Sequence, residues 1–251
     1  MSFWADKIIA VRTDKTIYRD GSSVIKLFDK DHSKSDVLCE AMNQARAEEA
    51  GLRVPAVVEV IPVDGKWGIR SVYVSGKTLR QLMDECPAQN AGLLERLVAL
   101  QMEVHSRRCP KLASLKDEFR SRICRADLDP AVRRKLEGEL EQMPERENFC
   151  HGDLNPSNVI VSDSGQDYLV DWPHASRGDA AADAALTYLS FYLHAGVPGA
   201  EAYMKLYCEK TGTERQQIER WLPLAAAALS VESRAAEREI LLRCVNQNEF
   251  Y

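Results

Sequence analysis

The residues best suited to chemistry lie in one segment, residues 150–161, which reads Cys-His-Gly-Asp-Leu-Asn-Pro-Ser-Asn-Val-Ile-Val. Its polar, turn-rich half carries Asp153 and Asn158, and a second apolar run, Tyr-Leu-Val-Asp-Trp at 168–172, ends near Asp171. If the two apolar runs pair as a hairpin through residues 162–165, the three polar side chains converge. Two carboxylates and an amide oxygen are hard-oxygen ligands, which suit Mg²⁺ rather than zinc.

The spacing of these residues is typical of phosphoryl transfer. Kinase catalytic loops follow the pattern His-x-Asp-x-x-x-x-Asn, with a further Asp at the end of a later strand. His151, Asp153 and Asn158 keep that spacing, and Asp171 stands where the later Asp belongs. Asn-Pro-Ser is also a common turn, so the alternative interpretation is that this segment simply starts a turn.

The motifs resemble those of the aminoglycoside phosphotransferase and choline kinase family, the small-molecule relatives of protein kinases. That family characteristically carries His-Gly-Asp, and Asp-Trp or Asp-Phe without a following Gly, as at residues 151–153 and 171–172 here. The resemblance extends along essentially the whole chain and is nearest to bacterial members whose substrate is unknown. It implies an α+β, protein-kinase-like fold with an N-lobe at residues 1–74 and a C-lobe at 75–251.

The N-terminal third of the chain agrees with a kinase-like N-lobe. Apolar, β-branched runs separated by turn signals predict strands at 7–11, 16–19, 23–28, 57–61 and 67–74, a five-stranded antiparallel sheet. Helical spacing of apolar residues predicts one helix over residues 35–50, with Ser33 or Ser35 as its cap.

Lys26 lies inside an otherwise apolar predicted strand, where an unpaired ammonium group is costly. Glu40, in the first turns of the predicted helix, is the partner we favour, with Glu48 and Glu49 as weaker competitors. By the resemblance, Lys26 binds the α- and β-phosphates of ATP and Glu40 holds it in place. The alternatives are a strand lysine that points to solvent and an ordinary exposed helix glutamate.

Other nucleotide contacts are expected from two connecting segments. The first hairpin loop, residues 12–15, has no glycine, so backbone N–H groups and the Thr13 hydroxyl are the phosphate contacts we expect, and Asp14 is expected to face away. The segment after the last strand of the sheet resembles the hinge of the family. Main-chain groups of Val72 and Val74 are therefore expected to bond the adenine edge.

The C-lobe is predicted to be mostly helical, with the catalytic loop, the metal site and the acceptor cleft. Asp179 is expected to cap the helix that follows it, and Asp183 to brace the catalytic loop. His105 either supports that loop or is a C-terminal helix histidine favoured by the helix dipole, and the two interpretations stay open. Further helical patterns cover residues 78–86, 91–106, 111–143, 200–211, 214–229 and 232–245.

Composition limits the remaining classes of function. The 251 residues carry a net charge of −5, so we expect no nucleic-acid partner, and no apolar run approaches the roughly 18 residues of a membrane helix. The start of the chain lacks a secretory signal pattern. Seven cysteines are scattered singly, which indicates a reduced, cytoplasmic protein. We expect a monomer or a weak homodimer.

The resemblance implies transfer of the ATP γ-phosphoryl group to a hydroxyl of a small molecule. Asp153 is the expected catalytic residue, and Asn158 and Asp171 are the expected ligands of Mg²⁺. Two alternatives remain: an atypical protein kinase, although no Asp-Phe-Gly or Ala-Pro-Glu signature is present, and a non-catalytic ATP-binding pseudokinase module. The acceptor stays open among antibiotics, sugars, amino alcohols and other metabolites.

Overall fold

The computed structural model describes residues 7–12 and 14–247, and these divide into two compact units. Unit 1 is the described chain up to Pro87 together with Pro156–His174, and unit 2 is Ala88–Asn155 together with the described chain from Ala175 onward. The predicted boundary after residue 74 differs from this division, because residues 76–78 pair with a strand that follows the catalytic loop. Lobes that divide at residue 74 stay a prediction.

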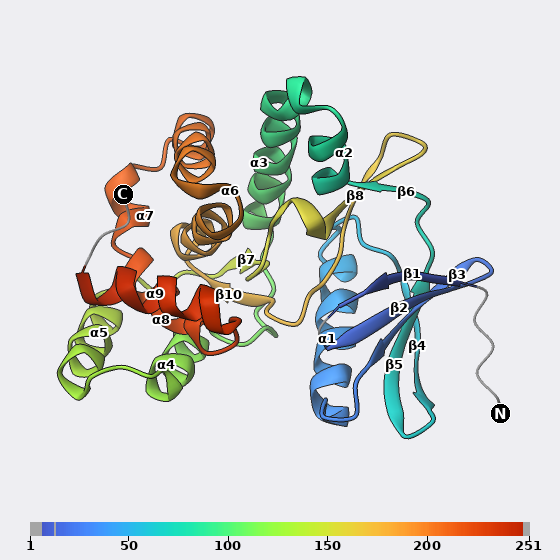
Figure 1. Ribbon diagram of the computed structural model, residues 1–251, viewed down its shortest axis with the longest axis horizontal. Coiled ribbons are helices and arrows are strands. Elements are labelled where there is room, and N and C mark those ends of the chain that lie inside the picture. The colour runs from blue at the N-terminus through green and yellow to red at the C-terminus, as the bar shows by residue number, and fades with distance from the viewer. Residues whose placement is uncertain (1–6, 13, 248–251) are drawn as a thin grey trace. The chain divides into compact units, whose positions relative to one another are not determined.

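The main sheet of unit 1 is antiparallel and has five strands in the order β1-β2-β3-β5-β4 (Figure 1). Its strands are β1 (Lys7–Val11), β2 (Lys15–Asp20), β3 (Ser23–Phe28), β4 (Val57–Val63) and β5 (Lys66–Val72). The prediction of five strands is confirmed, and the α+β fold class with it. β3, at the centre, is the most buried because both of its neighbours shield it.

Helix α1 (Lys34–Glu49) packs against this sheet in Figure 1. Ser33 caps it, because its hydroxyl accepts a 3.1 Å hydrogen bond from the Asp36 N–H. The apolar contact between helix and sheet is a small cluster formed by Phe28, Val37, Ala41 and Ile69. Three polar side chains of the same helix are also buried, namely those of Glu40, Asn43 and Gln44. They serve the site described below.

A second, three-stranded sheet in unit 1 has the order β6-β8-β9. The elements of this part are β6 (Gly76–Thr78), α2 (Leu79–Glu85), the 3-10 turns η1 (Pro87–Gln89) and η2 (Pro156–Asn158), β8 (Val159–Ser162) and β9 (Asp167–Leu169). The predicted hairpin after the catalytic loop is confirmed as β8 and β9. Gly76 is required at its position, because a Cβ atom there would lie 2.1 Å from the Val161 carbonyl oxygen.

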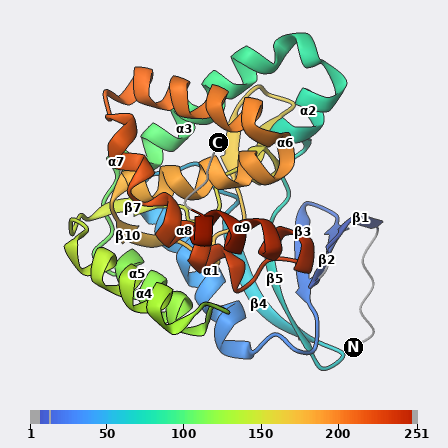
Figure 2. The same cartoon turned by 60° about the vertical axis from the view of Figure 1, so that its left-hand side comes forward.

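Unit 2 is helical apart from one short strand pair, β7 with β10. Its elements are α3 (Asn90–Ser106), α4 (Leu115–Arg125), α5 (Pro130–Gln142), β7 (Asn148–Cys150), β10 (Ser176–Gly178), α6 (Ala180–Thr211), α7 (Arg215–Glu219), α8 (Leu222–Ser230) and α9 (Ala235–Gln247). The alanine-rich α8 is buried on nearly every side, because α4, α6 and α9 pack around it (Figure 2). Small side chains allow that close packing.

Two helical predictions for unit 2 were too coarse. Residues 111–143 form two helices rather than one, since Pro130 starts α5 and Asp129 caps it. Residues 214–229 are likewise divided into α7 and α8, and Pro223 lies in the first turn of α8, where its missing N–H costs nothing. Helix α6 is kinked at Gly196, whose φ is 66°.

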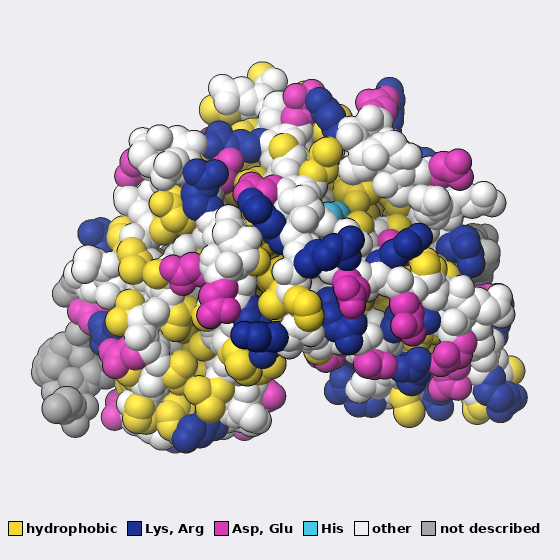
Figure 3. All heavy atoms as spheres, turned by 180° about the vertical axis from the view of Figure 1, so that it is seen from behind, with side chains coloured by type: hydrophobic (Ala, Val, Ile, Leu, Met, Phe, Trp, Pro, Cys, Tyr) yellow, Lys and Arg dark blue, Asp and Glu magenta, His cyan; other side chains and the backbone are white. Residues whose placement is uncertain are grey.

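Many charged side chains on the surface lie beside side chains of opposite charge. Arg120, in one of the basic clusters of the sequence, pairs with Asp117 at 2.5 Å and with Glu141 at 2.7 Å. On the face shown in Figure 3, Lys and Arg side chains are interspersed with Asp and Glu. Among the helices of the described residues, none combines the length and the apolar character that a membrane span requires.

Candidate active site

Lys26 lies at the centre of a buried ionic cluster in unit 1. Its ammonium group pairs with Glu40 of α1, and its Nζ lies 2.5 Å from Oδ1 of Asp171. The side chains of Lys26, Glu40 and Asp171 are 15%, 4% and 23% exposed, so the cluster is largely shielded from water. The structure thus brings together the strand lysine and the helix glutamate that the sequence pairs.

For Lys26 and Asp171 the opposite charges outweigh burial, whereas for Glu40 they do not. Burial lowers the pKa of Lys26, but the carboxylates of Asp171 and Glu40 raise it more, so the net pKa lies above its ordinary value. For Asp171, burial opposes ionisation, yet the two lysines Lys26 and Lys15 hold its pKa well below its usual range. Burial raises the pKa of Glu40, and Lys26 offsets only part of that effect.

Asp171 is held in an uncommon backbone conformation. Its φ is 72°, which lies in the left-handed region that residues other than glycine rarely adopt. Neighbouring hydrogen bonds fix this conformation: the Asn43 amide donates to the Trp172 carbonyl at 3.1 Å, and the Val170 N–H donates to the Asn158 carbonyl at 3.0 Å. The second bond also ties together the segments that carry the two predicted metal ligands.

A cavity of about 550 Å³ in unit 1 contains this cluster. Its lining includes Lys26, Glu40, Asn158 and Asp171, and also both predicted hinge residues, Val72 and Val74. The Val72 N–H donates to the Ala56 carbonyl at 2.9 Å, so it is engaged within the protein. No hydrogen bond is described for the main chain of Val74, which leaves it as the better candidate for a ligand contact within the described part of the chain.

Sequence reasoning missed Lys15 as a member of this site. Its Nζ lies 3.0 Å and 3.1 Å from the two carboxylate oxygens of Asp171, and its side chain is 12% exposed. The signal was available: the period-two alternation of a strand places Lys15 on the same face as Ile17, which is the cross-strand partner of Lys26. Asp14 does not line the cavity, and its carboxylate lies 3.9 Å from His32. Thr13, a predicted phosphate contact, falls outside the described residues.

The predicted catalytic residue, Asp153, lies in unit 2 in the loop after β7, and its side chain is partly exposed. Asn155 donates from its amide to Asp153 Oδ1 at 3.0 Å and to the Asp153 carbonyl at 3.1 Å. The Asp153 N–H in turn donates to Nδ1 of the buried His151 at 3.3 Å. Gly152 has φ of 83°, which explains why glycine precedes the aspartate.

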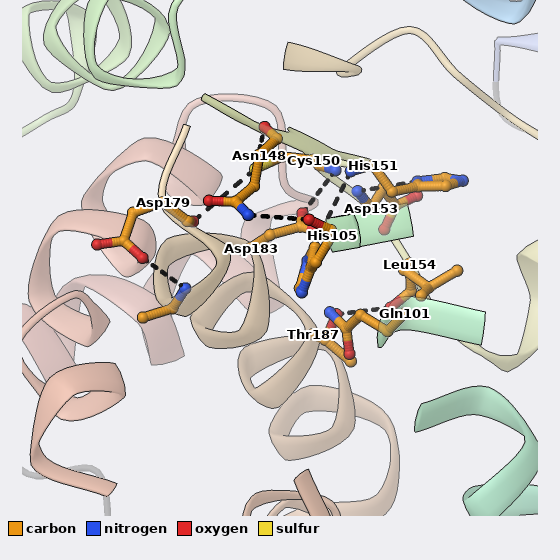
Figure 4. A network of polar contacts seen from close by, with 12 residues as sticks. Gln101, His105, Asn148, Cys150, His151, Asp153, Leu154, Asp179, Asp183 and Thr187 are labelled. Carbon is orange, nitrogen blue, oxygen red and sulfur yellow. Dashed lines mark hydrogen bonds and ion pairs between the residues drawn. The ribbon is translucent and has the colours of Figure 1, made fainter. Parts of the chain in front are cut away.

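Asp183 of α6 braces this loop from below (Figure 4). Its fully buried carboxylate accepts hydrogen bonds from the Gly152 N–H at 2.7 Å and from the His151 N–H at 3.1 Å. His105 Nε2 lies 2.9 Å from the same group. Burial opposes the charge, but the hydrogen bond from His105, the electrostatic influence of His105 and His151, and the hydrogen bond from the Gly152 N–H lower the pKa of Asp183. The bracing geometry that the sequence suggested is present.

His105 is a supporting residue rather than an exposed helix terminus. It is 7% exposed, and the Tyr207 hydroxyl lies 3.1 Å from its Nδ1. Because a carboxylate only accepts, Nε2 carries the proton toward Asp183, and the Tyr207 hydroxyl holds the other side of the ring at Nδ1. Asp179 caps α6, as predicted, since its carboxylate accepts from the Ala181 N–H at 2.9 Å.

The donors on the cavity fit Mg²⁺ better than a transition metal. Within residues 7–12 and 14–247, no group of three or more His, Cys, Asp or Glu side chains is arranged to hold a metal. Mg²⁺ in nucleotide sites is typically held by one or two protein oxygens, with phosphates and waters completing its shell. Asp171, kept ionised, and Asn158 provide such a set.

Comparisons with known proteins assign the family. The model of the phosphotransferase enzyme family matches residues 10–221, and the chain therefore belongs to that family. It is an enzyme of the phosphotransferase class, and the predicted family resemblance is confirmed. A comparison with curated proteins found no match.

Solved structures share the fold at low sequence identity. The aminoglycoside-3'-phosphotransferase of type VIII is 22% identical with a TM-score of 0.63, over 90% of this chain and 92% of that one. The aminoglycoside phosphotransferase APH(3'')-Id from Streptomyces rimosus, in complex with ADP and streptomycin, is 18% identical with a TM-score of 0.63, over 85% of this chain and 90% of that one. The choline kinase LicA from Streptococcus pneumoniae is 15% identical with a TM-score of 0.67, over 98% of this chain and 92% of that one. The kinase-like fold is thereby confirmed.

Proposed function

We propose that this protein is an ATP- and Mg²⁺-dependent kinase that transfers the γ-phosphoryl group to a hydroxyl of a small molecule. The observation that carries the proposal is the buried cluster of Lys26, Glu40 and Asp171 inside the cavity of unit 1. A buried lysine held between two carboxylates provides a fixed cation for phosphate. A similar structure was solved with ADP, which supports a nucleotide as the ligand.

Six of the predicted site residues have a role in this proposal. Lys26, fixed by Glu40, positions the α- and β-phosphates, and Val74 offers its main chain to the base. Asn158 and Asp171 hold the metal, whose charge neutralises the phosphate oxygens. Asp153 orients the acceptor hydroxyl and accepts its proton, a contribution of roughly 10²–10⁴ in rate. The rigid loop around Asp153 supports that role, because Asp183 and Asn155 restrict its backbone.

The acceptor is expected to be a small molecule with an alcohol group, since structures of similar fold belong to an aminoglycoside phosphotransferase and a choline kinase. The charged residues after Asp171 include both signs, so the sequence gives no particular support to a polycationic antibiotic. We place the enzyme in the cytoplasm, where ATP is available and where its free cysteines stay reduced.

The proposal is tested by nucleotide consumption with Mg²⁺ against pooled hydroxyl-bearing acceptors, namely aminoglycosides, macrolides, choline, sugars and amino acids. Consumption in one pool that is lost in Asp153→Asn supports the proposal and gives the substrate class. Consumption that Asp153→Asn retains in full would show that Asp153 is not the catalytic residue. A wild-type protein that binds no nucleotide with or without Mg²⁺ would contradict the proposal itself.

A further inference from the structure

Two lysines, not one, contact Asp171 in the cavity of unit 1, and they are held differently. Lys26 contacts two carboxylates, those of Glu40 and Asp171. Lys15 contacts both oxygens of Asp171, and in the described part of the chain it pairs with no other carboxylate. If a divalent cation takes the Asp171 carboxylate, Lys26 keeps Glu40, whereas Lys15 loses its partner while it still lies in a largely desolvated cavity.

The strand geometry directs Lys15 to the same space as Lys26. In the β2–β3 pairing, Ile17 lies opposite Lys26, and Lys15 lies two residues away on the same strand. Alternate residues of a strand share one face, so Lys15, Ile17 and Lys26 all face the cavity, and all three line it. Lys15 is also the residue that ends the β1–β2 loop, because its carbonyl accepts a 2.8 Å hydrogen bond from the Arg12 N–H.

The β1–β2 loop has no glycine that would let several backbone N–H groups approach a phosphate. The Arg12 N–H is already used in its hydrogen bond to the Lys15 carbonyl. A polyphosphate entering this end of the cavity therefore meets side-chain cations. Arg12, Lys15 and Lys26 line it, while Asp14 does not.

We propose that Lys15 is a phosphate-binding residue for the nucleotide, and that the phosphate replaces Asp171 as its partner when the nucleotide binds. On nucleotide binding, Lys15 leaves Asp171 to the metal and donates to the phosphate oxygens. A side-chain cation on β2 thus takes the role that the backbone N–H groups of a glycine-rich loop have in other kinases. This inference rests on the proposed function, since it requires that the cavity binds a nucleotide. It adds a residue that neither the motifs nor the family match assigns.

The test is a pair of binding titrations on the full chain, with Lys15→Gln, Lys15→Arg and the control Lys66→Gln. Lys66 is a matched control because it lies on the same sheet and also pairs with one carboxylate, Asp29 at 2.8 Å, but does not line the cavity. The first titration measures the Kd for ATP, with Mg²⁺ and with EDTA. The second measures the Kd for Mn²⁺ alone, by electron paramagnetic resonance of the free ion.

We expect Lys15→Gln to weaken ATP binding about tenfold or more under both conditions, since charge-assisted hydrogen bonds to phosphate are strong. Mn²⁺ alone should bind more tightly, because the competing ammonium group is gone. Lys15→Arg should retain ATP binding, and Lys66→Gln should match the wild type in both titrations. If the glutamine variant does not fold, Lys15→Met provides the same comparison.

ATP affinity within twofold of the wild type in Lys15→Gln would overturn the inference while leaving the proposed function intact. Equal weakening in Lys15→Gln and Lys15→Arg would also overturn it, because packing rather than charge would then be responsible. A wild-type protein that binds no ATP contradicts the proposed function, and the inference fails with it.

Discussion

Replacing Asp183 by alanine tests whether the catalytic loop depends on a single buried carboxylate. That carboxylate accepts from two backbone N–H groups and from His105, at 2.7, 3.1 and 2.9 Å, and none of its surface is exposed. Asp183→Ala leaves three buried donors without an acceptor. An unsatisfied buried group costs about 1–3 kcal/mol, and removing one partner of a buried ionic contact about 3–5 kcal/mol.

We therefore expect Asp183→Ala to lower the free energy of unfolding by about 3–5 kcal/mol, a large part of the roughly 5–15 kcal/mol typical of a folded protein. With an m-value of about 3 kcal/mol/M, the urea midpoint falls by roughly 1–1.7 M. Activity should fall further than stability explains, because Gly152 and His151 lose the acceptor that fixes the loop. Urea denaturation followed by circular dichroism, at a temperature where both proteins are folded, measures the first effect.

Glu209→Ala on the same helix is the control. Glu209 pairs with Lys205 at 3.9 Å, with both side chains well exposed, so its loss should change stability by less than about 0.5 kcal/mol. If Asp183→Ala costs less than about 1 kcal/mol and keeps full activity, Asp183 does not hold the loop and the reasoning is wrong.

Three further predictions concern the same site. The pKa of Asp183 is lower in the folded protein, so its contribution to the free energy of unfolding is present above the unfolded pKa of about 4 and is lost as pH falls through the folded value. The stability difference between wild type and Asp183→Ala should therefore shrink between pH 5 and pH 3, and a constant difference would refute this prediction. Gly152→Ala must place a side chain at φ of 83° and should cost about 1–2 kcal/mol in urea denaturation, whereas an unchanged midpoint would show that the loop adapts. Glu40→Gln removes one carboxylate from Lys26 and should weaken ATP binding about tenfold by calorimetry, an idea that fails if the affinity is unchanged.

Motif spacing and strand patterning were enough to predict the main elements of the site. The run of β-branched residues around Lys26 and the helical pattern around Glu40 set both on elements that had to pack together, because a buried ammonium group needs a partner. The hairpin after the catalytic loop followed from two apolar runs and a Gly-containing turn. These are local signals that tertiary packing reinforced.

Other features depend on contacts that no local pattern encodes. Alternation along β2 indicated the face on which Lys15 lies, but its contact with Asp171, 156 positions later in the chain, follows only from the fold. His105 remained ambiguous until Asp183 and Tyr207 were seen on either side of its ring. The division of residues 214–229 into two helices was missed although Pro223 was a readable signal, because the alanine-rich pattern continued through it.

The central claim is phosphoryl transfer to a small-molecule hydroxyl that depends on Asp153. The most direct measurement is transfer of the label from γ-³²P-ATP in the presence of Mg²⁺ and the acceptor pool that consumes nucleotide, with products separated from protein and inorganic phosphate. The proposal predicts a labelled phosphate ester of low mass, and its formation should be roughly 10²–10⁴-fold slower in Asp153→Asn. Label found only on protein or only in inorganic phosphate, or an Asp153→Asn variant as fast as the wild type, would contradict it.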